Sequence, residues 1–294
     1  MSLFQLPKWI KPHLFEDKKF KDLTQEELTD LKVKISKFKS DDPDVSIMIP
    51  AWNEENNIFR TLSSLSSNIT SLKVEIVVIN NNSTDKTQEV LDEIGVRNYL
   101  QSIQGTAFAR QLGLEKAKGK YHLCADSDSF YPPNWIDLMC APLRSENGTV
   151  GVYGRYSFIP LKNESRIPWY FYEKVTGLLV RIRKSRREHI NFLGFNMGFI
   201  TAVGRSNGGF NVLQTRTFDN AMGSDNFVEE AEDGRMAVNL KKTGSLKLVT
   251  NAKARVLTSS RRINAEGGLL KSFKHRLFKH SRQISEYLTG GKVE

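Results

Sequence analysis

Two stretches of the same design decide the fold: Val45–Ile58, VSIMIPAWNEENNI, and Val74–Thr87, VEIVVINNNSTDKT. Each begins with a short apolar run rich in β-branched residues, which is typical of a buried strand. We place these two strands at Val45–Ile49 and Val74–Ile79. Each run then passes into a polar loop and a helical pattern, so the sequence twice predicts a unit of strand, loop and helix.

The helices that follow these strands are predicted from apolar spacing and capping residues. The first spans Asn53–Ser67 with Asn53 as its N-cap, and the second spans Ser83–Gly95 with Gly95 as its end. The alternation continues with elements expected at Thr106–Lys118 (helix), Lys120–Ala125 (strand) and Asn134–Arg144 (helix). This order predicts an α/β fold with a Rossmann-like, mostly parallel sheet flanked by helices.

Strands and helices alternate less regularly in the N-terminal segment and in the second half of the chain. A helix over Thr24–Lys37 is predicted by TQEEL, which makes a capping box from Thr24 to Glu27. In the second half we expect strands at Val150–Tyr153, Gly198–Val203 and Leu246–Thr250, and a helix at Glu229–Lys242.

Composition fits one α/β domain with extensions. The chain has 294 residues, of which 39% are apolar, enough for a large core. The sequence has no apolar run of about 18 residues, so we predict no membrane span, and its first residues do not resemble a secretory signal. The two cysteines, Cys124 and Cys140, lie in apolar surroundings and are expected to be reduced. These features predict a cytoplasmic protein.

The formal net charge of +10 indicates a negatively charged partner, such as nucleic acid, anionic lipid or a phosphorylated small molecule. Basic residues concentrate at Lys8–Lys39, at Arg181–Arg187 and from Lys241 onward. Within the last region, Leu269–Leu288 has apolar residues at helical spacing with basic residues between them. This pattern fits either a helix on an anionic membrane surface or a helix that covers the core and exposes a charged face.

Three polar loops are expected to meet at one edge of the sheet: Pro50–Asn53, Asn80–Asp85 and Asp126–Asp128. Ligands of parallel sheets bind beyond the carboxyl ends of the strands, where these loops lie. In ADSDSFY, Asp126 and Asp128 stand one residue apart and repel each other unless a positive charge lies between them. A solvated turn is one interpretation. The neighbouring loops favour a cation site, for which oxygen ligands suit Mg²⁺ or Mn²⁺.

Two further polar groups each allow two interpretations. The amides of Asn80, Asn81 and Asn82 can pair with a nucleobase edge, or the residues can serve a left-handed turn. The acids Glu232 and Asp233 lie near the start of a predicted helix, where the helix dipole favours them. One of them could equally act as a general base.

Four blocks occur in order: VSIMIPAWNEENNI, EIVVINNNSTDKT, GTAFARQLGLEKAKGKYHLCADSDS and AEDGRMAVNLKKTG. Together they resemble the family 2 glycosyltransferases, which have the GT-A fold, over roughly residues 45–250. The resemblance implies an inverting, metal-dependent enzyme with Mg²⁺ or Mn²⁺ as cofactor. It would move a sugar from a nucleotide diphosphate sugar, UDP being the expected nucleotide, to a hydroxyl of a saccharide or lipid-linked glycan.

The resemblance also assigns roles to single residues. Asp126 and Asp128 match the pair that holds a metal on the donor diphosphate. Asp233 matches the base that deprotonates the acceptor, with Glu232 as its neighbour. The positions that match nucleotide-sugar contacts are Pro50, Ala51, Asn53, Glu54, Asn80, Asn81 and Arg110, in addition to Asp126.

One departure from related enzymes concerns the histidine that some of them use as a further metal ligand after the acidic helix. The sequence instead has Arg261 and Arg262, which either clamp a diphosphate directly or form a solvated basic turn. Met197–Phe210 falls where such enzymes receive the acceptor. The aromatic residues of Trp169–Tyr172 either stack on sugars or pack in the core.

We therefore expect a charged N-terminal extension at 1–42, a GT-A catalytic domain at 43–258 and a basic amphipathic C-terminal helical segment at 259–294. The nucleotide-binding half of the domain would span about 43–130 and the acceptor half about 131–258. If the C-terminal segment binds anionic lipid, the protein would lie on the inner face of a membrane. The acceptor could then be lipid-linked.

Two other classes of protein compete with this interpretation. A non-catalytic basic module for nucleic acid or membrane would need no acidic pair, and the sequence has no recognised nucleic-acid motif, so we expect no nucleic-acid partner. A sugar-phosphate nucleotidyltransferase would usually have a glycine-rich loop with basic residues after its first strand. PAWNEE has neither.

Overall fold

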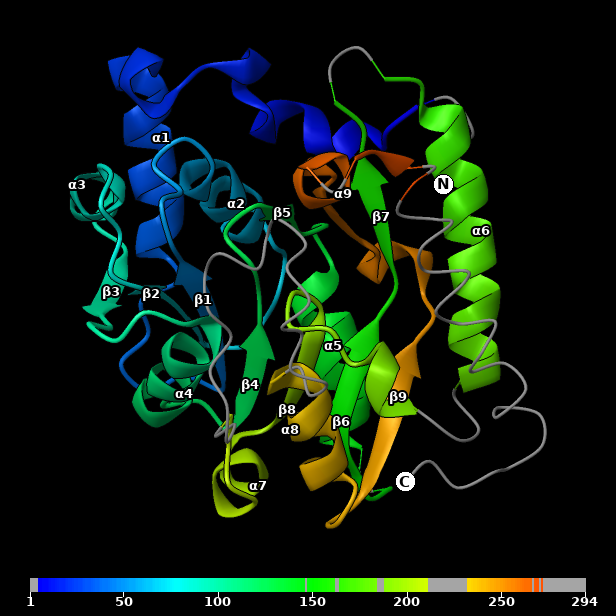
Figure 1. Cartoon of the computed structure of the whole chain (residues 1–294). Coiled ribbons are helices and arrows are strands. Elements are labelled where there is room, and N and C mark those ends of the chain that lie inside the picture. Colours follow the sequence, from blue (N-terminus) through cyan, green and yellow to red (C-terminus); the bar gives the residue numbers. More distant parts are fainter. Residues whose placement is uncertain are drawn as a thin grey trace.

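The computed structural model describes residues 5–145, 147–161, 164–183, 188–210, 232–265, 267–269 and 271. Within this part of the chain the strands form a seven-stranded sheet in the order β3-β2-β1-β4-β8-β6-β9 and a three-stranded sheet in the order β5-β10-β7 (Figure 1). Helices cover both faces of the large sheet, so the predicted α/β class is confirmed.

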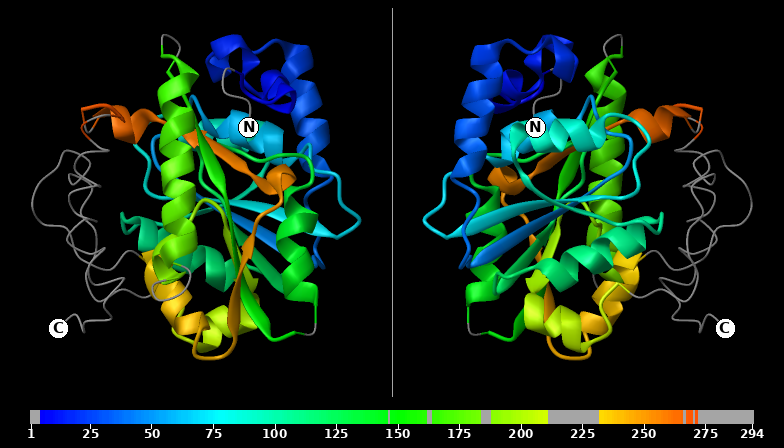
Figure 2. Two further views of the ribbon diagram at one scale, coloured as in Figure 1. Left: turned by 90° about the vertical axis from the view of Figure 1, so that its right-hand side faces the viewer. Right: turned by 90° about the vertical axis from the view of Figure 1, so that its left-hand side faces the viewer.

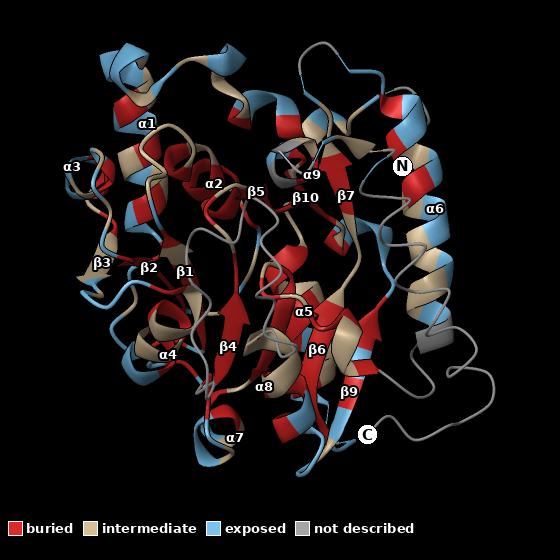
Figure 3. Cartoon of the chain, in the orientation of Figure 1, coloured by how far each residue is buried: buried red, intermediate tan, exposed pale blue. Residues whose placement is uncertain are grey.

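The first half of the large sheet is parallel. β1 (Val45–Ala51) pairs with β2 (Val74–Asn80) on one side and with β4 (Tyr121–Cys124) on the other. These are the three strands that the apolar runs predicted, and they are buried along almost their whole length (Figure 3). The edge strand β3 (Arg97–Leu100) was not predicted, because its partly exposed sequence RNYL contains no apolar run.

The helices of this half lie on opposite faces of the sheet. On one face α2 (Ile58–Leu65), α3 (Thr87–Ile94) and α5 (Trp135–Arg144) share a core with alternate side chains of β1. On the other face, α4 (Thr106–Lys116) packs against the remaining side chains of β1 and β2. The doubly covered sheet explains why both faces of β1 and β2 are apolar.

Two helices begin later than predicted. α2 starts at Ile58 rather than at Asn53, and α3 starts at Thr87 rather than at Ser83. Asn53 and Asn82 have left-handed backbones, with φ of 53° and 58°, so each loop turns once more before its helix begins. The prediction that Asn53 caps α2 is therefore wrong. The end of α3 at Gly95, with φ of 73°, is confirmed.

The second half makes the sheet mixed. β8 (Met197–Ile200) runs antiparallel to both β4 and β6 (Thr149–Gly154), and β9 (Ser245–Val249) is parallel to β6. The strand predicted over Gly198–Val203 instead ends at Ile200 and continues as helix α7 (Thr201–Ser206). At that junction the Thr201 hydroxyl donates a hydrogen bond of 2.6 Å to the Gly119 carbonyl, which turns the chain out of the sheet. α8 (Glu232–Leu240) covers the same face as α4.

The small sheet lies next to two residues of interest, because β5 follows Asp128 and β10 precedes Arg261. It contains β5 (Ser129–Phe130), β7 (Tyr156–Ile159) and β10 (Val256–Ser259), and α9 (Arg261–Ala265) follows β10. The long helix α6 (Arg166–Arg183) packs against β7 on the outside of the molecule, as Figure 2 shows from two sides. The short helices η4 (Glu188–Asn191) and η6 (Ala252–Ala254) lie in the connections.

The N-terminal extension wraps around α2. Its helix α1 (Gln25–Ser36) begins with the predicted capping box, in which Thr24 and Glu27 exchange hydrogen bonds of 2.8 and 3.2 Å. Ahead of it come three short helices, η1 (Lys8–His13), η2 (Phe15–Asp17) and η3 (Phe20–Asp22). The Arg60 guanidinium of α2 donates to the carbonyls of Leu14 and Lys18, so the extension is tied to the domain.

Two smaller predictions can be compared with the structure. Cys124 and Cys140 are buried free thiols, as expected. Most of the predicted helix over Leu269–Leu288 lies outside the described residues. Among the helices that are described, none combines the length and the hydrophobicity needed to cross a bilayer.

Gly198 tests the packing of the central sheet. A Cβ there would lie 2.4 Å from Cδ2 of Leu123 and 2.9 Å from the His122 carbonyl oxygen, in a strand that is paired on both sides. Gly198→Ala should lower the free energy of unfolding by about 1–3 kcal/mol in urea denaturation. The control is Gly177→Ala on α6, where a Cβ meets no atom within 4 Å. That variant should gain up to about 1 kcal/mol. Equal unfolding midpoints for the two variants would contradict this packing.

Candidate functional site

The loops that follow β1 and β2 are joined by hydrogen bonds centred on Asn53. The backbone amide of Asn53 donates to the Ser83 hydroxyl at 3.0 Å, and its side-chain oxygen accepts from the Thr84 amide at 2.8 Å. The amide of Glu54 donates to the Thr87 hydroxyl at 2.8 Å. Asn53 thus binds the loop that follows β2 and does not cap its own helix, α2. Two of the three loops predicted to meet at the sheet edge are held together in this way.

The loop after β4 joins the same group through α2. The Thr61 hydroxyl bonds to the carbonyls of Ser127 and Ser129, at 2.8 and 2.9 Å, which fixes the turn that carries the two aspartates. The amide of Asp126 donates to the Tyr131 hydroxyl at 2.8 Å, and that hydroxyl donates to the Phe195 carbonyl. The turn is therefore held by specific side chains and is not simply solvated.

The residues predicted to contact the nucleotide differ in how far a ligand could reach their side chains. Asn80 and Asn81 are each 2% exposed. Asn80 bonds to Gln88 and to the Ser83 amide, and Asn81 accepts from the Gly105 amide. These bonds explain the asparagines as loop-forming residues, and contact with a base remains a prediction. Pro50 and Ala51 end β1, where Ala51 is buried and Pro50 is partly exposed.

The two aspartates each face a different arginine. Asp126 Oδ1 lies 2.7 Å from Nη2 of Arg110, whereas Asp128 Oδ2 lies 3.0 Å from Nη2 of Arg261. The aspartate side chains are 26% and 23% exposed, so both can be reached from solvent. Their mutual repulsion is therefore offset by two arginines, which lie 16 and 133 residues away in the sequence.

Arg261 also binds Glu54, with Nη2 at 2.8 and 3.2 Å from the two carboxylate oxygens. Burial raises the pKa of Glu54; Arg261 opposes this shift, and Asp128 adds to it. The side chain of Arg261 is 45% exposed and so remains accessible to a ligand. The prediction for Arg262 concerns a side chain outside the described part of the structure.

The second acidic group lies at the start of α8, where Glu232 and Asp233 are partly buried. Asp233 accepts hydrogen bonds from the amides of Gly194, at 3.0 Å, and Gly234, at 2.8 Å. Burial and the adjacent Glu232 carboxylate raise the pKa of Asp233 from 3.8 to about 6, although Arg110 opposes the shift. A carboxylate with such a pKa can accept a proton near neutral pH.

Arg110 connects the two acidic groups. Its guanidinium is buried and lies 2.7 Å from Asp126, while Nε lies 3.7 Å from Oε1 of Glu232. Nη1 donates to the Gly194 carbonyl at 3.1 Å. Burial opposes the charge, but Asp126, Glu232 and Asp233 outweigh it and place the pKa of Arg110 above its usual value. The sequence resemblance named Arg110 as a nucleotide contact and did not predict these pairings.

Gly194 is the residue of this site that sequence reasoning missed. Its amide binds Asp233 and its carbonyl binds Arg110. A Cβ would lie 2.2 Å from Nη2 of Arg110, so a larger residue would push the guanidinium away from Asp126. Its bond to Arg110 crosses 84 residues of sequence, and no local pattern signals such a contact.

Asp126 and Asp128 could hold a divalent cation only together with further ligands from a bound substrate. Among the described residues, no three His, Cys, Asp or Glu side chains gather where they could hold a metal ion. Asp126 and Asp128 supply two carboxylates on one turn. Mg²⁺ is commonly bound by one or two carboxylates together with substrate phosphates, so these residues fit a cation that arrives with a diphosphate.

The aromatic segment Trp169–Tyr172, predicted to stack on sugars or to pack in the core, lies partly in the core. Trp169 and Tyr172 are buried against Phe158 and Ile263, whereas Phe171 is 60% exposed on the other side of α6. The segment Met197–Phe210 supplies β8 and α7, with Phe199 and Phe210 in the core.

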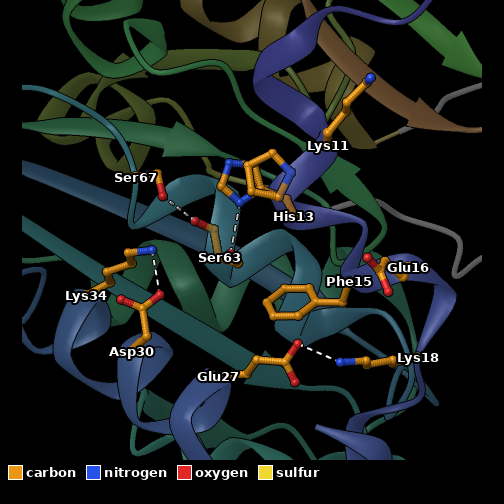
Figure 4. A pocket seen from close by; sticks show the side chains of 11 residues that line it. Lys11, His13, Phe15, Glu16, Lys18, Glu27, Asp30, Lys34, Ser63 and Ser67 are labelled. Carbon is orange, nitrogen blue, oxygen red and sulfur yellow. Dashed lines mark hydrogen bonds and ion pairs between the residues drawn. The ribbon is translucent and has the colours of Figure 1, made fainter. Parts of the chain in front are cut away.

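A separate pocket lies under the N-terminal extension (Figure 4). It has a volume of about 480 Å³ and is lined by η1, η2, α1 and α2, with the side chain of His13 bonded to Ser63 at 2.9 Å. Burial, followed by nearby Lys34, lowers the pKa of His13 to about 4. The pocket includes none of the residues predicted for the donor or the base.

Comparisons with known proteins identify the family of the chain. The model of glycosyl transferase family 2 matches residues 46–206, and the chain therefore belongs to that family. Glycosyltransferase GlyA of Streptococcus pneumoniae is 29% identical over 146 residues, which cover 46% of this chain and 20% of GlyA. An uncharacterized glycosyltransferase of Haemophilus influenzae is 30% identical over 126 residues, covering 41% of this chain and 50% of that protein.

The fold also matches a solved structure. The crystal structure of S. aureus TarS superimposes with a TM-score of 0.50 and 17% identity, over 74% of this chain and 36% of TarS. The predicted GT-A fold is confirmed. The chain matches between a fifth and a half of the length of these proteins.

The raised pKa of Asp233 predicts a pH-dependent stability. The folded protein keeps this proton up to about pH 6 and the unfolded chain releases it near 3.8. The folded state therefore binds more protons in this window, and stability falls as pH rises through it. Asp233→Asn lacks the ionised form, so at pH 7 its free energy of unfolding should exceed that of the unsubstituted protein by roughly 1–3 kcal/mol.

Urea denaturation at several pH values measures this difference. It should shrink towards zero near about pH 4, where the carboxyl is protonated in the folded state. A difference independent of pH would show that burial of Asp233 does not raise its pKa.

Proposed function

We propose that this glycosyltransferase moves a sugar from a nucleotide diphosphate sugar, with UDP as the nucleotide, to a hydroxyl of a saccharide or lipid-linked glycan. One observation carries the proposal: buried Arg110 lies between Asp126, after β4, and the acidic pair Glu232 and Asp233, at the start of α8. This arrangement supports a site in which Asp126 would serve the leaving diphosphate and the acidic pair would serve the attacking hydroxyl.

On the donor side, Asp126 and Asp128 would hold Mg²⁺ or Mn²⁺. The cation would neutralise the diphosphate and make it a better leaving group. Arg261 is partly exposed and is bound to Asp128. It would also bind the same phosphates, because one guanidinium group can donate two parallel hydrogen bonds to the oxygens of a phosphate. The loops at Pro50–Glu54 and Asn80–Asn81 would enclose the nucleoside.

On the acceptor side, Asp233 would take the proton from the attacking hydroxyl. The amides of Gly194 and Gly234 hold its carboxylate in one orientation, and its pKa of about 6 leaves it ionised at neutral pH. Attack from the face opposite the diphosphate in a single displacement inverts the anomeric carbon. Glu232 lies beside Nε of Arg110 and would help to position it, and Arg110 in turn would orient Asp126.

The alternatives have less support. Membership of family 2 favours sugar transfer over nucleotidyl transfer. A non-catalytic basic module gives no reason for a carboxyl with a raised pKa beside a buried arginine. We further propose that residues 43–258 form the catalytic domain, with 1–42 and 259–294 as extensions, and that the protein works in the cytoplasm.

Two substitutions separate the donor role from the base role. Asp128→Asn should abolish the rise in melting temperature that a UDP-sugar gives only in the presence of Mn²⁺. Asp233→Asn should keep that rise and lose at least about a hundredfold in the rate of sugar transfer, since general bases typically contribute that much. The two variants serve as controls for each other in one thermal-shift and turnover experiment.

Three results would overturn the proposal. Transfer at an unchanged rate by Asp233→Asn would remove it as the base. Loss of the donor response in Asp233→Asn, with the response kept in Asp128→Asn, would reverse the two roles. If no nucleotide sugar stabilises the unsubstituted protein with or without metal, the proposed donor class is wrong.

Arg261→Gln tests whether this arginine acts on the donor. With its charge removed, Asp128 and Glu54 lose their shared cation and should attract a free metal ion more strongly. We expect tighter Mn²⁺ binding without donor, measured by calorimetry, and a smaller thermal shift with the UDP-sugar. If both values stay unchanged, Arg261 belongs to a solvated turn.

A further inference from the structure

The outward face of α6 has the composition of a buried face. Ile167, Phe171, Val175 and Leu178 are 38%, 60%, 38% and 58% exposed. Their spacing of four, four and three residues places them in one stripe along the helix. Figure 2 shows α6 on the outside of the molecule. A surface helix normally turns polar residues to water, so this stripe needs a partner that is itself apolar.

The opposite face of α6 already anchors the helix. Trp169 and Tyr172 are buried against Phe158 of β7. Arg166 and Glu173 form a buried ion pair of 2.8 Å, and Glu173 also accepts from the Phe158 amide. The outward apolar side chains are therefore not needed to hold α6 on the domain.

The charges on the outward face are positive. Lys174 and Arg181 are exposed and flank the apolar stripe at helical spacing. Glu173 is the one acidic residue in the sequence of α6, and its carboxylate is turned inward to Arg166. The chain after Arg181 reads IRKSRR, which extends the basic character in the sequence. The stripe is thus apolar in the middle and cationic along one side.

We propose that this face of α6 docks the protein on an anionic membrane surface. Amphipathic helices with Phe and Leu on one side and Lys and Arg beside them bind at the boundary between headgroups and acyl chains. A second copy of the chain fits less well, because pairing two such faces would bring Lys174 and Arg181 towards their counterparts. Each chain also has a net charge of +10.

Docking in this way would bring the candidate site close to the lipid. α6 packs on β7, and the same small sheet contains β5, which follows Asp128, and β10, which leads to Arg261. A glycan acceptor held in the membrane would then be presented beside the donor site. Membrane docking itself does not depend on the proposed transfer reaction, and it is tested by binding alone.

Vesicle flotation of the full chain tests the proposal. The probe is phosphatidylcholine vesicles with about one third phosphatidylglycerol, compared with phosphatidylcholine alone. The double substitution Phe171→Gln with Leu178→Gln should weaken partitioning to the anionic vesicles by about tenfold or more, because two large apolar side chains no longer enter the lipid. The matched control is Ile69→Gln with Leu100→Gln, which replaces side chains that are 70% and 62% exposed elsewhere. It should bind as the unsubstituted protein does.

A second variant tests the electrostatic part. Lys174→Glu with Arg181→Glu should reduce binding and remove much of its dependence on salt. Equal binding by the α6 variants and the control would overturn the proposal, as would equal partitioning to neutral and anionic vesicles. A concentration-dependent dimer, seen by light scattering and abolished by Phe171→Gln with Leu178→Gln, would assign the stripe to a second copy instead.

Discussion

The buried guanidinium of Arg110 is the contact on which the candidate site depends. A charge removed from water is tolerated only when partners satisfy it, and Arg110 has Asp126 at 2.7 Å and the Gly194 carbonyl at 3.1 Å. Glu232 lies slightly farther away, at 3.7 Å. This requirement fixes where α8 starts relative to β4. The loop at Gly194 must pass so close that it has no room for a side chain.

The second arginine of the site has a different character. Arg261 lies between Asp128 and Glu54 at the surface, where water screens the interaction and exchange is easy. The two aspartates of ADSDSFY are therefore balanced by one enclosed cation and one accessible cation. The enclosed pair shapes the site, whereas the accessible pair can give way to a ligand. This division explains how two adjacent carboxylates persist in a folded chain without opening the turn.

The elements that sequence predicted well are those whose signal is local. The runs at Val45–Ile49 and Val74–Ile79 are buried on both faces, so their composition alone indicates strands. The start of α2 was misplaced because the side chain of Asn53 binds the Thr84 amide, 31 residues away, instead of capping its own helix. The end of β8 was missed for a similar reason, since the turn at Thr201 depends on the Gly119 carbonyl.

The sequence by itself determined the alternation of β1, α2, β2, α3, α4, β4 and α5, the three polar loops that follow β1, β2 and β4, and the family, because each rests on patterns within a short stretch. Only the tertiary structure decided which charges meet. It paired Asp126 with Arg110 and Asp128 with Arg261, and it raised the pKa of Asp233. It also turned an apolar stripe of α6 outward. These outcomes depend on distance and burial, and residues far apart in sequence acquire them only when the chain is packed.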